Sequence, residues 1–212
     1  MGDLIRIYTN DDRLGIAKGE ARRRMWSPDE LERFRVAALA AGKPSPALAV
    51  DLAYELGQRP GDTLRLAWAQ WDEYRVALTQ SKRKARVAVP VTSPDLIEQL
   101  NTMTRSGVQI PLNETIGRPY TAHAFNAQFR RLRAKAGLPS DLQARDTRRT
   151  ALTEAGDGGG TDSQLQSPNG HCNRQSVASY VHPSSTMAAG AQAARERARN
   201  RRGKIATKKS EK

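Results

Sequence analysis

The stretch EYRVALTQSKRKARVAVPV, residues 73–91, restricts the possible folds more than any other part of the chain. Two runs rich in β-branched residues flank a short basic run, which is the pattern of a β-hairpin. The tip of this hairpin would carry Lys82, Arg83 and Lys84. The nearby segment WAQWD, residues 68–72, is a candidate third strand. Helix signals dominate the rest of the chain, so we expect a mainly α-helical fold with a small antiparallel β-sheet.

The clearest helix signal lies ahead of the hairpin, in SPDELERFRVAALAAGK at residues 27–43. Ser27 is suited to cap this helix, Pro28 fits its first turn, and Glu30 completes a capping box. Residues 105–120 are rich in glycine and proline and are expected to form a loop. Further helices are expected in residues 46–57, 60–66, 94–100, 121–137 and 144–156.

The charge of the chain points to a polyanionic partner. Lys and Arg number 35 against 22 acidic residues, which gives a formal net charge of +13 over 212 residues. Residues 195–212 hold +7 of this charge and residues 1–194 keep +6, so the body of the chain is basic without its tail. Such a balance favours nucleic acid or another anionic surface as partner.

Other features argue against several kinds of site. The single cysteine, Cys172, has no partner for an intrachain disulfide, which fits a reducing, cytoplasmic setting. No apolar run approaches the roughly 20 residues that span a bilayer, so no membrane partner is expected. Three scattered histidines without a cysteine cluster argue against a zinc site. DGGG at residues 157–160 lacks the following GK[ST] of a phosphate-binding loop. We therefore expect no cofactor and no metal.

Four segments carry the residues with the chemistry of a functional site. They are GQRPGDTLRLAWAQWD (57–72), QSKRKARVAVPV (80–91), RDTRRTALTEAG (145–156) and GHCNRQSVASYVHP (170–183). Their order and intervals resemble those of the tyrosine recombinases, the phage-integrase family. The resemblance implies a catalytic domain over residues 26–190. It would be preceded by an arm or linker at residues 1–25 and followed by a basic helix end and tail at residues 191–212.

The resemblance implies a site in which basic side chains and one tyrosine surround a DNA phosphate. Arg59 matches the first arginine of the family, and Arg148 matches the second. Lys82 matches the catalytic lysine of the hairpin. His171 matches the histidine of the family's GH motif, and Tyr180, nine residues later, matches the nucleophile.

Arg145 departs from the family pattern, because most members have a histidine at this position. Arginine can still donate hydrogen bonds there. Its guanidinium stays charged near neutral pH, however, so it cannot act as a general base. Asp62, three residues after Arg59, fills the acidic position that is usual in the family.

These residue types suit phosphodiester cleavage on general grounds as well. In-line attack builds negative charge on the non-bridging oxygens, which preorganised arginines such as Arg59 and Arg148 stabilise. Tyr180 would attack phosphorus and form a covalent phosphotyrosine, linked to the 3′ side as the resemblance implies. Lys82 would protonate the leaving 5′ oxygen, and His171 would bond a non-bridging oxygen or help to deprotonate the tyrosine. The covalent bond stores the phosphodiester energy, so neither ATP nor a metal is required.

Each candidate residue also has a plainer interpretation. Arg59 could pair with Asp62 or cap a helix, and Lys82 could be a solvated hairpin lysine, with Lys84 as the alternative acid. His171 and Tyr180 could be buried structural residues. A basic surface stripe could account for Arg145, Arg148 and Arg149.

The resemblance implies a site-specific recombinase or integrase of a mobile element that acts on double-stranded DNA. It also implies a homotetramer on DNA, and we expect a monomer when the protein is free. Two other functions remain open at this point. One is a non-catalytic DNA-binding relative, which Arg145 would suit, and the other is a basic RNA-binding module.

Overall fold

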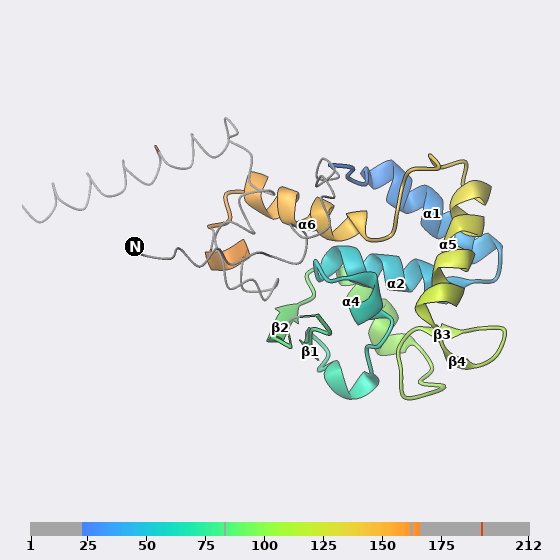
Figure 1. The fold of residues 1–212 in the computed structure, drawn as a ribbon. Coiled ribbons are helices and arrows are strands. Elements are labelled where there is room, and N and C mark those ends of the chain that lie inside the picture. Colours follow the sequence, from blue (N-terminus) through green and yellow to red (C-terminus); the bar gives the residue numbers. More distant parts are fainter. Residues whose placement is uncertain (1–22, 83, 162, 166–191, 193–212) are drawn as a thin grey trace, which may run out of the picture.

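The computed structural model describes residues 23–82, 84–161, 163–165 and 192. α-Helices and two short antiparallel hairpins make up this part of the chain (Figure 1). The helices are α1 (Pro28–Ala40), α2 (Pro44–Glu55), α3 (Pro60–Thr63), α4 (Pro94–Thr102), α5 (Ala122–Lys135) and α6 (Asp146–Asp157), with a 3₁₀ turn η2 (Trp68–Gln70). The strands are β1 (Arg75–Thr79), β2 (Arg86–Pro90), β3 (Leu112–Asn113) and β4 (Arg118–Pro119). The predicted class, mainly α-helical with a small antiparallel sheet, is confirmed.

The start of α1 follows the sequence signal closely. The Ser27 hydroxyl accepts a hydrogen bond from the Glu30 backbone N–H at 3.1 Å, and the Glu30 carboxylate accepts one from the Ser27 backbone N–H at 2.9 Å. This reciprocal pair satisfies two backbone donors that a helix start otherwise leaves unpaired. The helix therefore begins where the capping box predicts.

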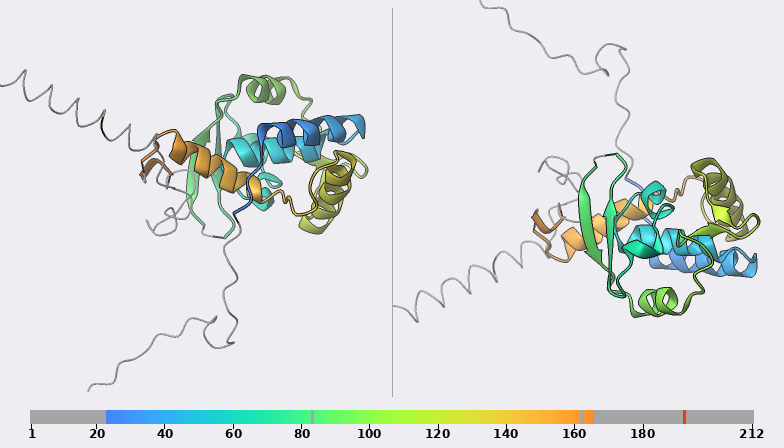
Figure 2. Two further views of the ribbon diagram at one scale, coloured as in Figure 1. Left: turned by 90° about the horizontal axis from the view of Figure 1, so that it is seen from above. Right: turned by 90° about the horizontal axis from the view of Figure 1, so that it is seen from below.

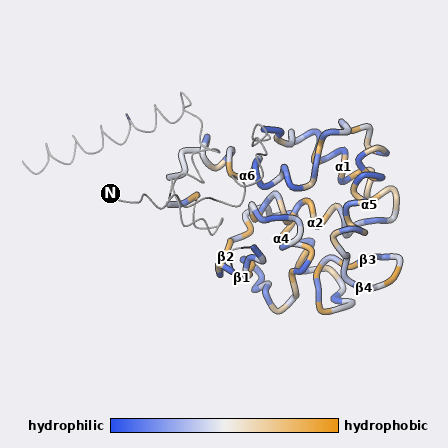
Figure 3. The backbone as a smooth tube through the Cα atoms, viewed as in Figure 1, coloured by the Kyte–Doolittle hydropathy of each residue, from blue (hydrophilic) through white to orange (hydrophobic). Residues whose placement is uncertain are grey.

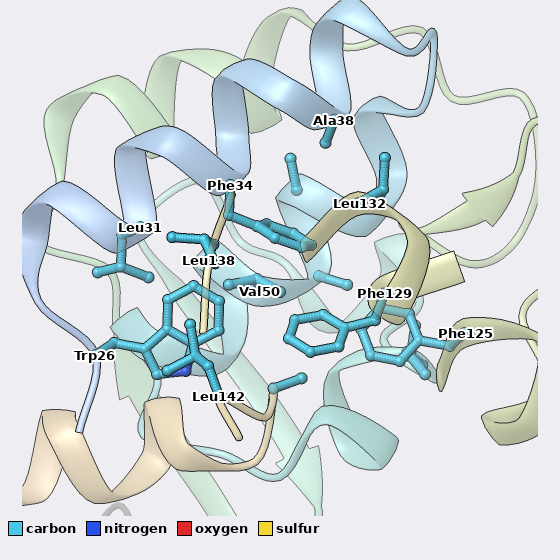
Figure 4. Close-up of a cluster of buried hydrophobic side chains, with 14 of the residues drawn as sticks. Trp26, Leu31, Phe34, Ala38, Val50, Phe125, Phe129, Leu132, Leu138 and Leu142 are labelled. Carbon is cyan, nitrogen blue, oxygen red and sulfur yellow. The ribbon is translucent and has the colours of Figure 1, made fainter. Parts of the chain in front are cut away.

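The first hydrophobic core joins α1, α2, α5 and the segment leading into α6 (Figure 4). The ring of Phe34 in α1 lies 5.0 Å from that of Phe129 in α5, and Trp26 meets Phe34 edge-on at 5.8 Å. Trp26 also donates its indole N–H to the Gln143 carbonyl at 3.0 Å and its backbone N–H to the Thr150 hydroxyl at 2.8 Å. Packing and hydrogen bonding together fasten the chain ahead of α1 to α6.

The second core lies between α2 and the β1–β2 hairpin. Leu48 and Leu52 of α2 belong to this core, whereas Ala49 and Val50 of the same helix belong to the first. Every second residue of both strands is buried, because alternate side chains of a strand point to opposite faces. The views of Figure 2 show the hairpin beside α6, and Val89 of β2 shares a cavity lining with residues of that helix. One central helix thus holds both the hairpin and α6.

The hairpin is confirmed, but the third strand expected at residues 68–72 is wrong. Residues 68–70 form the 3₁₀ turn η2, with isolated bridges from Ala67 to Gln109 and from Trp71 to Val76. The cause is the side chain of Gln70. It accepts a hydrogen bond from the Ala67 backbone N–H and donates one to the Ala77 carbonyl, both at 2.9 Å. The backbone contact to β1 is thus limited to the bridge at Trp71, and the Gln70 side chain adds a contact at Ala77.

Smaller differences concern the ends of elements. The helix expected over residues 60–66 ends at Thr63 and continues as tighter turns, with the Leu66 N–H donating to the Thr63 carbonyl at 3.1 Å. The loop expected at residues 105–120 contains the short hairpin β3–β4. Hydrophobic and hydrophilic residues intermix along the elements in Figure 3, as expected where each element turns one face to a core. None of the described helices is long and apolar enough to cross a membrane.

Candidate active site

Three consecutive residues between α2 and α3 connect the parts of the site. Gly57 ends α2 with φ +59°, a left-handed conformation in which any side chain would be strained. Its carbonyl accepts a hydrogen bond from the Arg148 guanidinium of α6 at 3.0 Å. The next residue, Gln58, accepts a hydrogen bond from Gln80 at the end of β1, at 2.7 Å. Arg59 follows as the first flanking residue of α3. The sharp turn at Gly57 thus brings α6 and the hairpin next to Arg59.

Arg148 is a buried cation. It lies in the first turn of α6 and is 6% exposed, so it does not belong to a surface stripe. A buried guanidinium is costly unless hydrogen bonds compensate it, and the Gly57 carbonyl supplies one of them. This bond also fixes the orientation of the planar group relative to the α2–α3 turn.

Arg59 retains hydrogen-bonding capacity. Its side chain is 31% exposed, yet the Nη1 atom is buried and has no hydrogen-bond partner among the residues that the structure describes. The Asp62 Oδ2 atom lies 4.0 Å from it, beyond hydrogen-bond distance. The two residues therefore form a loose ion pair rather than a closed one. Arg59 therefore keeps a donor that no described residue uses.

Asp62 ties α3 to the hairpin. Its Oδ1 atom accepts hydrogen bonds from the Ser81 backbone N–H and from Arg65, both at 3.0 Å. Burial on its own raises the pKa of this carboxyl, but the hydrogen bonds from Ser81 and Arg65 outweigh it and hold the pKa below its usual value. An ionised Asp62 therefore anchors the residue directly ahead of Lys82.

Lys82 lies exposed in the turn of the hairpin. The turn is closed at its base by two backbone bonds, from the Gln80 N–H to the Ala85 carbonyl and from the Lys84 N–H to the Gln80 carbonyl, both 2.9 Å. Lys84 is also exposed and adopts φ +56°. Ser81, which is anchored to Asp62, directly precedes Lys82, so Lys82 lies nearer than Lys84 along the chain to the fixed end of the turn.

Arg145 lies apart from the Gly57 turn, at the start of α6. It is exposed and lines a cavity of about 550 Å³ between α3, α5 and the segment ahead of α6. Gly61 of α3 and the polar residues Asn126, Arg130 and Gln143 share this lining. Because Pro60 also borders the cavity, it opens next to the α3 end that carries Arg59. The surroundings of Arg145 therefore suit a phosphate backbone, which is polar and anionic.

The remaining candidates are only partly covered by the structure. His171 and Tyr180 lie outside the described residues, so their positions stay predictions. Arg149 is half-buried on α6. Within the described ranges, no three His, Cys, Asp or Glu side chains lie close enough together to hold a metal ion.

Sequence reasoning missed Gln58 and Gln80. Both are fully buried, at 0% exposure, although glutamine usually lies at the surface. The sequence indicates their importance only through their neighbours, because Gln58 directly precedes Arg59 and Gln80 directly precedes Ser81. Nothing in either local segment indicates that the two side chains meet across 22 positions.

Comparison with known proteins identifies the family of the chain. A sequence profile of the phage integrase family matches residues 25–187. The integrase of Escherichia phage HK022 is 38% identical over 79 residues, which are 36% of this chain and 21% of that protein. The lambda integrase tetramer bound to a Holliday junction aligns with a TM-score of 0.65 and 22% identity, over 83% of this chain and 53% of that one. XerA recombinase aligns with a TM-score of 0.63 and 16% identity, over 87% of this chain and 68% of that one.

These matches differ in what they establish. The two structural alignments are below 25% identity and show the fold, and the chain spans about half of the lambda integrase chain. The profile match covers most of the described residues, including both arginines and the hairpin. The chain therefore belongs to the phage integrase family, the tyrosine recombinases.

Proposed function

We propose that residues 26–190 form the catalytic domain of a tyrosine recombinase, which breaks and rejoins double-stranded DNA through a 3′-phosphotyrosine intermediate. The observation that carries this proposal is the arginine pair. The Arg148 guanidinium is bonded to the Gly57 carbonyl, two residues ahead of Arg59, and Arg59 keeps a buried N–H donor that has no partner in the described part of the chain. Two arginines from distant segments at one turn suit a phosphodiester with developing negative charge.

The chemistry follows from the roles of the side chains. The phenol oxygen of Tyr180 attacks phosphorus, and its proton passes to the imidazole of His171. The bond between phosphorus and the 5′ oxygen breaks, the electron pair stays on oxygen, and the ammonium of Lys82 protonates it. Arg59 and Arg148 bind the non-bridging oxygens. Attack by the 5′-hydroxyl of another strand reverses these steps and rejoins the DNA.

Arg145, where most family members have a histidine, adds a fixed positive charge in place of a group that can exchange a proton. Its exposed side chain borders the polar cavity beside α3, where it would bind a DNA phosphate. This charge also supports the second candidate function, a DNA-binding relative that has lost turnover. The two functions differ in whether a covalent link to DNA forms.

A nicked duplex that releases a short strand on cleavage separates the candidates, because release of that strand traps the covalent adduct. We expect a DNA-linked protein band with the full chain and none with Tyr180→Phe. Tyr74→Phe, which alters an exposed phenol on the way into β1, is the matched control and should keep the band. A mobility shift without an adduct would favour the non-catalytic relative, and preference for RNA in competition would reject both.

The partners proposed are double-stranded DNA and further copies of the chain. The lambda integrase relative was crystallised as a tetramer on a Holliday junction. For this chain we propose a tetramer on DNA and a monomer in its absence. Sedimentation of the free protein and of its complex with a four-way junction tests this, and a stable tetramer in DNA-free buffer would contradict it.

A further inference from the structure

Two hydrogen-bonded side-chain amides, those of Gln58 and Gln80, lie buried between Arg59 and the hairpin turn that carries Lys82, which we call the lysine turn. The Gln80 side-chain amide N–H donates to the Gln58 side-chain oxygen, Oε1, at 2.7 Å, and the Gln58 side-chain N–H donates to the Leu56 backbone carbonyl at 3.0 Å. Both side chains are 0% exposed. Hydrogen bonds of this kind are directional and strengthened by the low local dielectric, so they fix geometry in a way that apolar packing of equal volume does not.

The positions of the two residues link the lysine turn to the arginines. Gln58 is the neighbour of Arg59, and its backbone belongs to the Gly57 turn that receives Arg148. Gln80 forms the base of the lysine turn, since its backbone N–H donates to Ala85 and its carbonyl accepts from Lys84. A shift at either amide therefore moves the lysine turn relative to the arginines.

A second bond acts on the same turn from α3. The Asp62 carboxylate accepts a hydrogen bond from the Ser81 backbone N–H at 3.0 Å. The turn that carries Lys82 is thus held by two successive residues, Gln80 through its side chain and Ser81 through its backbone. Lys82 itself is exposed, so its position depends on the backbone of the turn.

We propose that the buried Gln58–Gln80 pair is a positioning device for the general acid. It sets the lysine turn in register with Arg59, so that the Lys82 ammonium reaches the leaving 5′ oxygen of the phosphate that the arginines hold. This inference rests on the proposed function. The two glutamines do not belong to the proposed catalytic residues. Their role concerns one step, the protonation of the leaving group.

The test compares two leaving groups. In a DNA with sulfur in place of the bridging 5′ oxygen, the thiolate leaves without a proton, because thiols are far more acidic than alcohols. Gln80→Met keeps the side-chain volume and removes the hydrogen bond. We expect it to slow single-turnover cleavage of ordinary DNA at least tenfold, part of the ~10²–10⁴ that a general acid contributes. Cleavage of the sulfur-bridged DNA should stay at the wild-type rate.

Three further variants make the test specific. Lys82→Ala should show the same selective loss, but larger. The double variant Gln58→Met with Gln80→Met no longer leaves the Gln58 side-chain oxygen without its donor, so its unfolding free energy should recover in part relative to the single variant. The selective loss should persist, because the directional contact is still absent. Gln70→Ala removes a different glutamine contact to the same hairpin, at Ala77, and should not discriminate between the two substrates.

The outcomes separate this inference from the proposed function. Equal losses on both substrates, or no loss, in Gln80→Met would overturn the positioning role while the wild-type adduct still supports a recombinase. Failure of the sulfur-bridged DNA to rescue Lys82→Ala would reject lysine as the acid and the positioning role with it. Absence of any adduct from the wild-type chain would reject the proposed function, and this inference would fall as a consequence.

Discussion

Arg148 carries a permanent charge into a nearly closed environment, where an apolar side chain of similar size would cost less to bury. Its bond to the Gly57 carbonyl compensates part of this cost and orients the guanidinium toward the turn that presents Arg59. A charge retained under these conditions is explained by an anionic ligand more readily than by stability.

Replacing Arg148 should greatly reduce the rate of DNA cleavage while most of the protein stays folded. For Arg148→Met we expect covalent adduct formation to fall by about 10²–10³-fold, as for the loss of one preorganised donor to a transition state. Arg148→Lys should also fail to restore it, because an ammonium lacks the bidentate geometry. Adduct yield on the nicked duplex measures both. Arg149→Ala, the adjacent half-buried arginine, is the control, and an equal loss there would contradict a special role for Arg148.

Asp62 makes the stability of the fold depend on pH. Its folded-state pKa is lowered by hydrogen bonds from Ser81 and Arg65 in spite of its burial. The stabilisation is therefore fully present above the unfolded pKa of about 3.9, and it is lost as the pH falls through the folded-state pKa. For Asp62→Asn we expect an unfolding free energy about 1–3 kcal/mol below wild type at neutral pH. This difference should shrink on acidification below about pH 4.

Urea unfolding of both proteins at a series of pH values measures this difference. Asp29→Asn, which removes an exposed carboxylate of α1 that pairs loosely with Arg33, serves as the control and should lower the unfolding free energy far less than Asp62→Asn. A difference between Asp62→Asn and wild type that stays constant down to the lowest accessible pH would contradict an ionised, hydrogen-bonded Asp62.

Among the helices and strands, features set by neighbouring residues follow from the sequence, whereas contacts between distant residues do not. The β1–β2 hairpin and the α1 capping box follow from residues close together in sequence, and both are confirmed. The strand expected at residues 68–72 is wrong, because residues 68–70 form a 3₁₀ turn whose Gln70 side chain bonds to Ala77, a contact that no periodicity encodes. The Gln58–Gln80 pair escaped prediction for the same reason. Placement of His171 and Tyr180 in the site stays a prediction.

Trp26 links α1 to the chain around the start of α6, because its ring packs on Phe34, its indole N–H donates to Gln143 and its backbone N–H donates to Thr150. Trp26→Ala should lower the unfolding free energy by about 3–5 kcal/mol, as for other buried aromatic residues. Trp26→Phe keeps a ring and should cost less. Denaturant unfolding followed by far-UV circular dichroism compares the two. A loss below about 1 kcal/mol for Trp26→Ala would show that the first core does not depend on it.

Across the molecule, the distribution of charge bears on how the chain would bind DNA under the proposed function. Residues 195–212 hold +7 of the net +13, and residues 1–194 hold +6. The described body contributes Arg145 and Arg130 at the lining of one polar cavity. If the chain acts on DNA as proposed, the basic body and the basic tail sequence would share the phosphate contacts.

Replacing the nine basic residues of 195–212 with serine should weaken DNA binding and flatten its salt dependence. Each phosphate neutralised by the tail adds about 0.9 to the slope of log K against log salt, because condensed counterions are released. We expect the slope to fall by several units while binding to the body persists at low salt. Fluorescence anisotropy of a labelled duplex over a salt series measures both proteins. An unchanged slope would mean that the tail does not contact DNA, and the basic body would then account for all the phosphate contacts.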